Sequence, residues 1–190
     1  METEKNNEEI DSKIKWRKTN NTKKVALTAV LISVGLILSY LNPFAYIPIF
    51  DIKINPFVHL VNALSGVLIG VIFSCITALG IAILRYSFAI GSIHAFHGGV
   101  SGALIVGIFS YIFHKKIPKY INFAALTEPI GTVFIGGTIA HFIAPLGPLS
   151  ESLFFYWGLF AASSIPGCFL GYGLLQVLKR NGITSEDFTR

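Results

Sequence analysis

The residues of this chain that could do chemistry are a small polar set placed in long apolar runs. They are His59, Asn62, Arg85, His94, His97, Glu128, His141, Glu151, Tyr156 and Trp157. Such side chains are costly in apolar surroundings, and they usually face a cavity or one another. Imidazole, amide and guanidinium groups offer hydrogen bonds, and the two aromatic rings can stack on a ligand. The set therefore predicts a polar binding pocket.

The stretch from His94 to Gly107 is the densest part of this pattern. Its two histidines, His94 and His97, are three residues apart, which places them on one helical face. Gly98 and Gly102 follow with the spacing that lets a neighbouring helix approach closely. We interpret the segment as a helix that forms one wall of the pocket.

Catalytic readings of the same residues find less support. His94 and His97, joined by His59 and His141, would offer imidazole ligands to a metal, but no second carboxylate or HExxH pattern accompanies them. The chain also lacks Gly-x-Ser-x-Gly and a phosphate-binding loop. A small intramembrane metal-dependent enzyme and a stand-alone secondary transporter remain alternatives to a binding protein. We expect no catalytic residue, no resident metal and no cofactor.

The composition assigns these elements to a membrane. Hydrophobic residues make up 53% of the chain and charged residues 13%, whereas soluble domains carry about 25% charged residues. The basic residues flank the apolar runs instead of forming a patch, so the net charge of +5 does not indicate nucleic-acid binding.

The apolar runs predict an all-α membrane protein with six transmembrane helices in one domain over residues 25–180. Polar tails are expected at 1–24 and 181–190, and a proline-rich loop that serves as a lid is expected at 42–56. Because the apolar stretch 57–88 is too long for one helix, we place a tight turn near Gly70. The expected helices are 25–41, 57–69, 71–86, 95–113, 121–143 and 152–178.

The distribution of Lys and Arg predicts how these helices are oriented. Nearly all of these residues fall in the two tails and in the segment after residue 113, which makes those regions cytoplasmic and both termini internal. The polar set then gathers in the outer halves of the helices, as an outward-facing pocket. Glu128 is the exception, because it lies in an inner half directly before Pro129. We expect a structural or gating role for its carboxylate ahead of direct ligand contact.

Three segments carry a resemblance to a known family. They are PFVHLVNALSGVLIG from Pro56, AFHGGVSGALIVGIFSY from Ala95 and LTEPIGTVFIGG from Leu126. Together they resemble the ThiW-type substrate-binding (S) component of energy-coupling-factor vitamin transporters over most of residues 23–180. Two positions depart from the family wording: Val58 stands before His59 where glutamine is usual, and His97 replaces a proline.

The resemblance implies the function and the partners. An S component of this type would capture a thiamine precursor, the thiazole moiety hydroxyethylthiazole, at the plasma membrane of a prokaryote. It would work with a transmembrane coupling subunit and two cytoplasmic ATPases, and topple within the membrane to release its ligand. Ala29 and Ser33 stand where the family uses small residues to dock the coupling subunit. The thiazole would stack on Tyr156 or Trp157 and hydrogen-bond to His59, Asn62 or His94.

Overall fold

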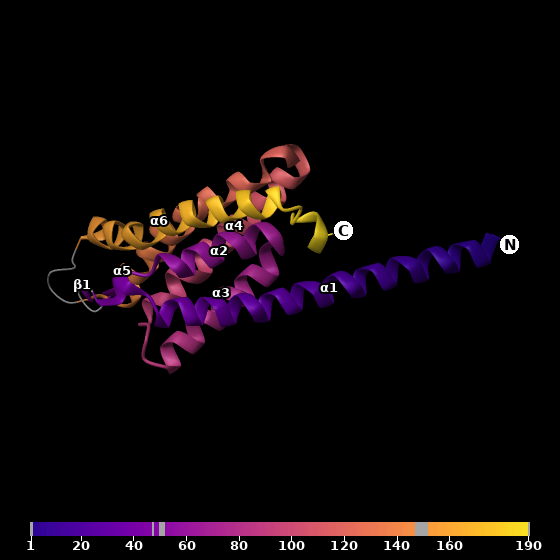
Figure 1. Ribbon diagram of the computed structural model, residues 1–190. Helices are drawn as coiled ribbons and strands as arrows, with labels where there is room; N and C mark the ends of the chain where they lie inside the picture. Colours follow the sequence, from indigo (N-terminus) through magenta and orange to yellow (C-terminus); the bar gives the residue numbers. More distant parts are fainter. Residues whose placement is uncertain (1, 47, 50–51, 147–151, 190) are drawn as a thin grey trace.

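A bundle of long helices forms most of the molecule (Figure 1). The computed structural model describes residues 2–46, 48–49, 52–146 and 152–189. The elements in chain order are α1 (Glu2–Tyr40), η1 (Pro43–Tyr46), β1 (Pro48–Ile49), β2 (Ile52–Lys53), α2 (Pro56–Leu68), α3 (Gly70–Ser87), α4 (His94–Lys116), η2 (Pro118–Thr127), η3 (Ile130–Gly136), α5 (Gly137–Ile143), α6 (Leu153–Arg180) and α7 (Glu186–Thr189).

Five helical segments of the described chain are long and apolar enough to cross a membrane. They are Asn21–Tyr40, Gly70–Ser87, His94–Lys116, Pro118–Ile143 and Leu153–Arg180. α2 is apolar but shorter: its 13 residues extend about 20 Å, less than the roughly 30 Å of a bilayer's hydrocarbon core. The protein is therefore a helical, multi-pass membrane protein.

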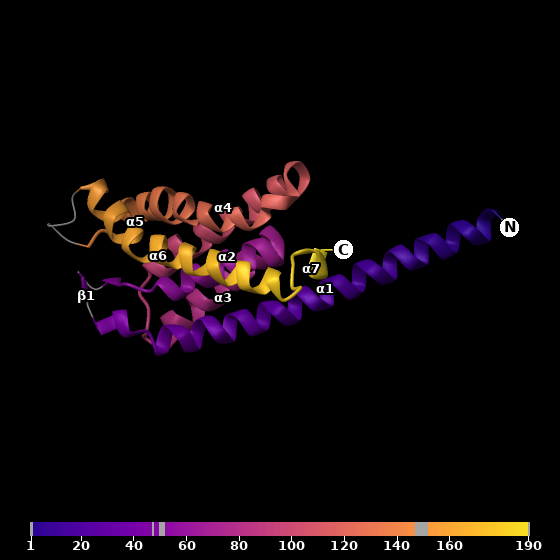
Figure 2. The same cartoon turned by 45° about the horizontal axis from the view of Figure 1, so that its top comes forward.

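The helix α2 occupies the centre of the bundle, packed against α3, α4 and α6. Its side chains from Val58 to Leu68 are almost all buried, and they form the larger apolar core with residues of η2 and α6. A second cluster joins Val133 and Ala140 to Leu159 and Phe160 of α6. α1 lies at the edge, on α3 and α2, and both chain termini lie at the same end of the bundle (Figures 1 and 2).

The turn expected near Gly70 is confirmed. Gly70 has φ of +79°, a left-handed conformation that only glycine adopts without strain. A Cβ at this position would have nothing within 4 Å, so the backbone conformation alone accounts for the glycine. The turn separates α2 from α3 within the charge-free stretch, as the length of that stretch required.

The first helix is longer than predicted. We expected a polar tail over 1–24 and a helix from Val25, whereas α1 is continuous from Glu2 and contains 39 residues. At 1.5 Å per residue the helix extends roughly 60 Å, and its amino-terminal part projects beyond the remaining bundle (Figure 1). The apolar span predicted at 25–41 corresponds to its carboxyl-terminal half.

The fifth span is the main correction to the predicted helices. Instead of one α-helix over 121–143, the chain forms a 3-10 helix (η2), a π-helix (η3) and a short α-helix (α5). The change of winding occurs at Glu128 and Pro129, where proline lacks the N–H that a regular helix needs. π-turns of this kind are rare and often mark functional sites.

The segment predicted as a loop at 42–56 contains no α-helix among its described residues before Pro56, where α2 begins. It forms the short η1 and a two-stranded hairpin in which Pro48 is opposite Lys53 and Ile49 is opposite Ile52. The side chain of Asn42 donates to the carbonyl oxygen of Ile54 at 2.7 Å, which closes the segment into a loop over the end of α2.

Candidate functional site

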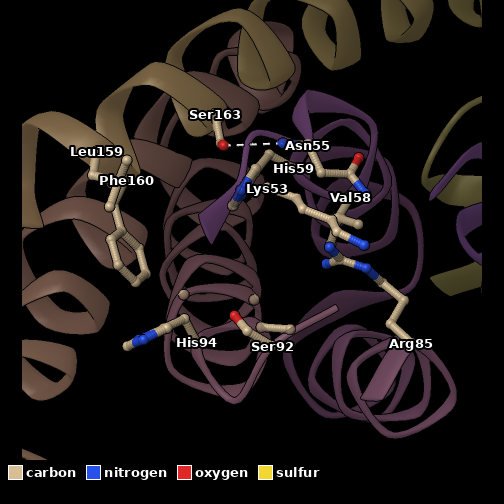
Figure 3. Close-up of a pocket in the computed structure, with 13 residues that line it drawn as sticks. Lys53, Asn55, Val58, His59, Arg85, Ser92, His94, Leu159, Phe160 and Ser163 are labelled. Atoms are coloured by element: carbon tan, nitrogen blue, oxygen red, sulfur yellow. Dashed lines mark hydrogen bonds between the residues drawn. The ribbon is translucent and has the colours of Figure 1, made fainter. Parts of the chain in front are cut away.

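A polar recess opens at the end of the bundle opposite the chain termini (Figures 1 and 3). It holds about 520 Å³ of empty space, mouth included. The residues that line it come from the 42–56 loop, from α2, α3, α4 and α6, and from the loop before α4. They are Lys53, Asn55, Val58, His59, Arg85, Ser92, His94, Ala95, Gly98, Gly99, Leu159, Phe160 and Ser163.

Arg85 is the charged residue buried in this recess. It lies in the last turn of α3, and its side chain is only 6% exposed. The chain after α3 folds back over it, because the amides of Ile90 and Gly91 both donate to the Arg85 carbonyl oxygen at 3.0 Å. A Cβ on Gly91 would lie 3.3 Å from Arg85 Nε, so this glycine lets the loop pack directly on the guanidinium. In Figure 3 the guanidinium points from α3 towards the centre of the recess.

Asn55 connects the loop at the mouth of the recess to two helices. Its amide N–H donates to Ser163 Oγ at 3.1 Å (dashed in Figure 3), and its side-chain Nδ2 donates to Ser39 Oγ at 2.9 Å. All three residues are buried. The described part of the predicted lid is thus fixed to α6 and α1, with Asn55 and Lys53 lining the space below it.

Glu128 lies beneath the recess and is completely buried. Its Oε1 atom is 2.7 Å from His59 Nδ1, and it accepts hydrogen bonds from Asn62 Nδ2 at 3.2 Å and Thr132 Oγ1 at 2.6 Å. A carboxylate can only accept, so the hydrogen bond places a proton on His59 Nδ1. His59 and Asn62 share a helical face, as predicted, and both use it to bind this carboxylate.

The same network connects α4 to the fifth span. Asn62 Nδ2 also donates to Gly99 O at 3.0 Å, and Thr132 Oγ1 is 3.0 Å from Gly98 O. A Cβ on Gly102 would overlap the carboxylate of Glu128 and the hydroxyl of Thr132. The close approach predicted for the Gly98 and Gly102 ridge is therefore confirmed, and it brings η3 against α4 around a polar centre.

Three of the ten predicted pocket residues, His59, Arg85 and His94, line the recess. Two more, Asn62 and Glu128, lie directly below it. Glu151 lies outside the described residues. The sequence therefore identified the polar centre better than it identified the walls.

The remaining four predicted residues do not line the recess. The hydroxyl of Tyr156 accepts the Leu146 amide at 2.7 Å, and Trp157 Nε1 donates to Thr138 Oγ1 at 3.1 Å. His141 packs its ring against Tyr156 with centroids 5.3 Å apart. His97 lies beside His94, with ring centroids 5.9 Å apart, but is not among the lining residues.

Phe160 supplies the aromatic face instead of Tyr156 or Trp157. Its side chain is 7% exposed and its ring meets that of His94 edge to face at 6.3 Å. Ser163, three residues further along α6, also reaches the recess. Phe160 and Ser163 follow Tyr156 by four and seven residues, about one and two helical turns, and this spacing was the sequence signal available for them. Lys53 and Asn55 carried no such signal, because the loop offers no periodicity.

The residues described by the structure contain no group of three or more His, Cys, Asp or Glu side chains placed to hold a metal ion. Of the four histidines considered as metal ligands in the sequence, His59 binds Glu128, His141 packs on Tyr156, and His94 lies beside His97.

The outer face of α1 carries Ala29 and Ser33 in exposed positions. The Ser33 hydroxyl donates to the Ala29 carbonyl oxygen at 3.0 Å, so its polar atom is satisfied within the helix. Large apolar side chains stand beside them, with Val30 55% and Ile37 55% exposed. This face has small residues at its centre and no partner within the described chain.

Comparison with known proteins agrees with the resemblance seen in the sequence. The family model described as thiamine-precursor transporter protein (ThiW) matches residues 25–181. No significant match is found among curated proteins or among solved structures. The matched region contains every helix from the apolar half of α1 to the end of α6, and with it the recess and the Glu128 network. This chain therefore belongs to the ThiW family of thiamine-precursor transporter proteins.

Proposed function

We propose that the protein is the substrate-binding component of an energy-coupling-factor importer and that its recess captures a small thiamine precursor from outside the cell. The observation that carries this proposal is a polar recess at one end of an otherwise apolar bundle in a chain of this family. The thiazole half of thiamine, hydroxyethylthiazole, is the ligand that the resemblance implies.

The shape and lining of the recess suit a small ring with polar substituents. Phe160 and Leu159 offer apolar contact from α6, while His94 and Ser92 offer hydrogen bonds from the opposite wall. Asn55 and Ser163 hold the loop across the mouth, so the ligand would be enclosed on most sides.

The orientation proposed for the bundle places the recess on the extracellular side. The recess lies opposite both termini, and the end that carries the termini also carries Lys115, Lys116, Lys179 and Arg180. By the positive-inside rule that end is cytoplasmic, with α2 counted as the sixth crossing.

Release into the cytoplasm then requires the site itself to move. Glu128, Asn62 and Thr132 are each 0% exposed and fill the space below the recess. The small-residue face of α1 around Ala29 and Ser33 would dock the transmembrane coupling subunit, and two cytoplasmic ATPases would drive the movement. The chain is a binding protein and transporter component in this scheme, and catalysis is left to the ATPases.

The test separates binding from coupling. Purified full-length protein should be stabilised against heat by the thiazole half of thiamine and not by its pyrimidine half. Ser33→Phe should leave that stabilisation unchanged but abolish uptake in cells that express the coupling module. Ile72→Phe, at an exposed apolar position of α3, is the matched control and should transport normally. Uptake that persists in vesicles without any ATPase would contradict the proposal and favour a stand-alone transporter.

A further inference from the structure

Arg85 has a guanidinium that is buried without a partner. Among the described residues, the structure shows no hydrogen bond and no ion pair to this group, and its Nε atom is both buried and unsatisfied. Among the residues that the structure describes, the ion pair in the bundle interior joins His59 to Glu128 and does not involve the arginine. A permanently charged group is thus held inside the protein with its hydrogen-bonding capacity unused.

This arrangement is not that of an arginine extended towards lipid headgroups. Such a side chain keeps its charged end in water, whereas Arg85 is only 6% exposed. A Cβ added to Gly91 would lie 3.4 Å from Arg85 Cζ, so the loop that contains Gly91 packs on the guanidinium. Buried charges in proteins are normally paired, because removing an ion from water without compensation is expensive.

The recess around Arg85 is positive. Lys53 at the mouth is the second cation, and no Asp or Glu is among the described residues that line the recess. The amino end of α4, a helix of 23 residues, also reaches the recess through His94 and Ala95. The partial positive charge at a helix amino terminus favours an anion in the same place. The charged side chains among the described lining residues therefore all have the same sign.

We propose that Arg85 binds an oxyanion of the transported molecule, so that the recess takes its thiamine precursor in an anionic form. This inference rests on the proposed function and narrows its substrate class to a thiazole that carries a phosphate ester or a carboxylate. The guanidinium fork matches either oxyanion with two parallel hydrogen bonds. Phe160 and Leu159 would contact the ring, and Lys53 would close the mouth over the anion.

The test compares three ligands on full-length protein in phosphatidylcholine nanodiscs. They are the uncharged thiazole alcohol, its phosphate monoester and the thiazole whose side chain ends in a carboxylate. We expect at least one anionic ligand to bind at least tenfold more tightly than the alcohol. Arg85→Gln should remove that advantage, so that the anionic ligands bind no more tightly than the alcohol. Lys119→Gln, which removes an exposed cation at the other end of the bundle, should change neither affinity.

Two results would overturn the anion proposal while leaving the proposed function intact. One is an alcohol that binds as tightly as both anions. The other is an Arg85→Gln variant that weakens all three ligands equally. If none of the three ligands binds but inorganic phosphate stabilises the protein only when Arg85 is present, the thiazole assignment fails and the anion site stands. If neither the ligands nor phosphate has an effect, both proposals fail.

Further arms identify other partners for the guanidinium. Arg85→Gln should be at least as heat-stable as the native chain without ligand, because the substitution removes an uncompensated charge. A variant that fails to fold would show that the arginine is paired within the protein, and would overturn the proposal. Tighter anion binding by Asp51→Asn or Glu151→Gln would also overturn the proposal, because it would show that a carboxylate of this chain pairs with Arg85. An Arg85-dependent loss of phosphate-ester affinity on adding phosphatidylglycerol would assign it to a lipid headgroup.

Discussion

Gly102 is the position where one added methyl group meets the polar centre of the bundle. A Cβ there would overlap both the Glu128 carboxylate and the Thr132 hydroxyl, which belong to the fifth span. Neither neighbour is free to yield, since both are 0% exposed and hydrogen-bonded to each other at 2.6 Å. Gly102→Ala must therefore separate α4 from η3 or displace the carboxylate from His59.

The expected cost follows from these two routes. Overpacking of a filled interior costs about 1–3 kcal/mol, and loss of a hydrogen bond to a charged group costs about 1.5–3 kcal/mol. Alanine is favoured over glycine inside a helix by about 1 kcal/mol, which offsets part of the loss. We expect Gly102→Ala to lower the free energy of unfolding by about 2–4 kcal/mol. For a chain of this size that is a fall in Tm of roughly 5–15 °C.

The assay is thermal unfolding of the purified protein in detergent, followed by intrinsic fluorescence. Gly173→Ala is the matched control, because Gly173 is an exposed residue of α6 whose added Cβ would have nothing within 4 Å. It should be neutral or stabilising by up to about 1 kcal/mol. Equal melting temperatures for the two variants would refute the close packing described for Gly102 and, with it, the fixed position of Glu128.

Three further substitutions test other parts of the structure. Gly70→Ala should lower the free energy of unfolding by about 1–2 kcal/mol because φ is +79°, and Gly70→Asn should lower it less. Equal stability of the native and alanine forms would contradict the left-handed turn. Glu128→Ala should lower the free energy of unfolding by about 2–4 kcal/mol, since His59 Nδ1 then has no acceptor. Glu128→Gln retains an acceptor oxygen and should lower the free energy of unfolding by less than half as much. A larger loss for Glu128→Gln would argue against the hydrogen bond. Phe160→Leu should weaken ligand binding about 2–10-fold, whereas Trp157→Leu, outside the recess, should change the affinity less than twofold. The opposite result would show that the ligand contacts Trp157 and not Phe160.

The features that the sequence predicted correctly are those set by strong local constraints. Length alone required a break in the apolar stretch 57–88, and a glycine is the residue that tolerates the left-handed turn found at position 70. The spacing of Gly98 and Gly102 likewise fixes which face of α4 can be approached closely. Prolines at 43 and 48 excluded an α-helix from the loop over the recess, and Pro56 stands at the first position of α2, where a helix tolerates proline.

The rotation of each helix about its axis was much harder to predict. A soluble helix has one apolar face that identifies its buried side, but α4 and α6 are apolar all round, as helices in lipid can be. The prediction therefore chose Tyr156 and Trp157 for the pocket because of their chemistry, and the structure turns Phe160 into it. Hydropathy also does not distinguish α, 3-10 and π winding, so Pro129 was the only warning that the fifth span is irregular.

The turn at Gly70 also affects how the bundle can sit in lipid. Residues 60–84 contain no charged side chain, and α2 is about 10 Å shorter than the hydrocarbon core it would have to cross. Charged and aromatic residues at the membrane surface are what hold a helix at a fixed depth. The hairpin of α2 and α3 has no charged anchor at its closed end, so a change of depth there would drag no charge through the lipid. His59, near the start of α2, and Arg85, near the end of α3, both lie at the open end of that hairpin, so the part of the bundle least attached to the bilayer surface contributes two walls of the recess.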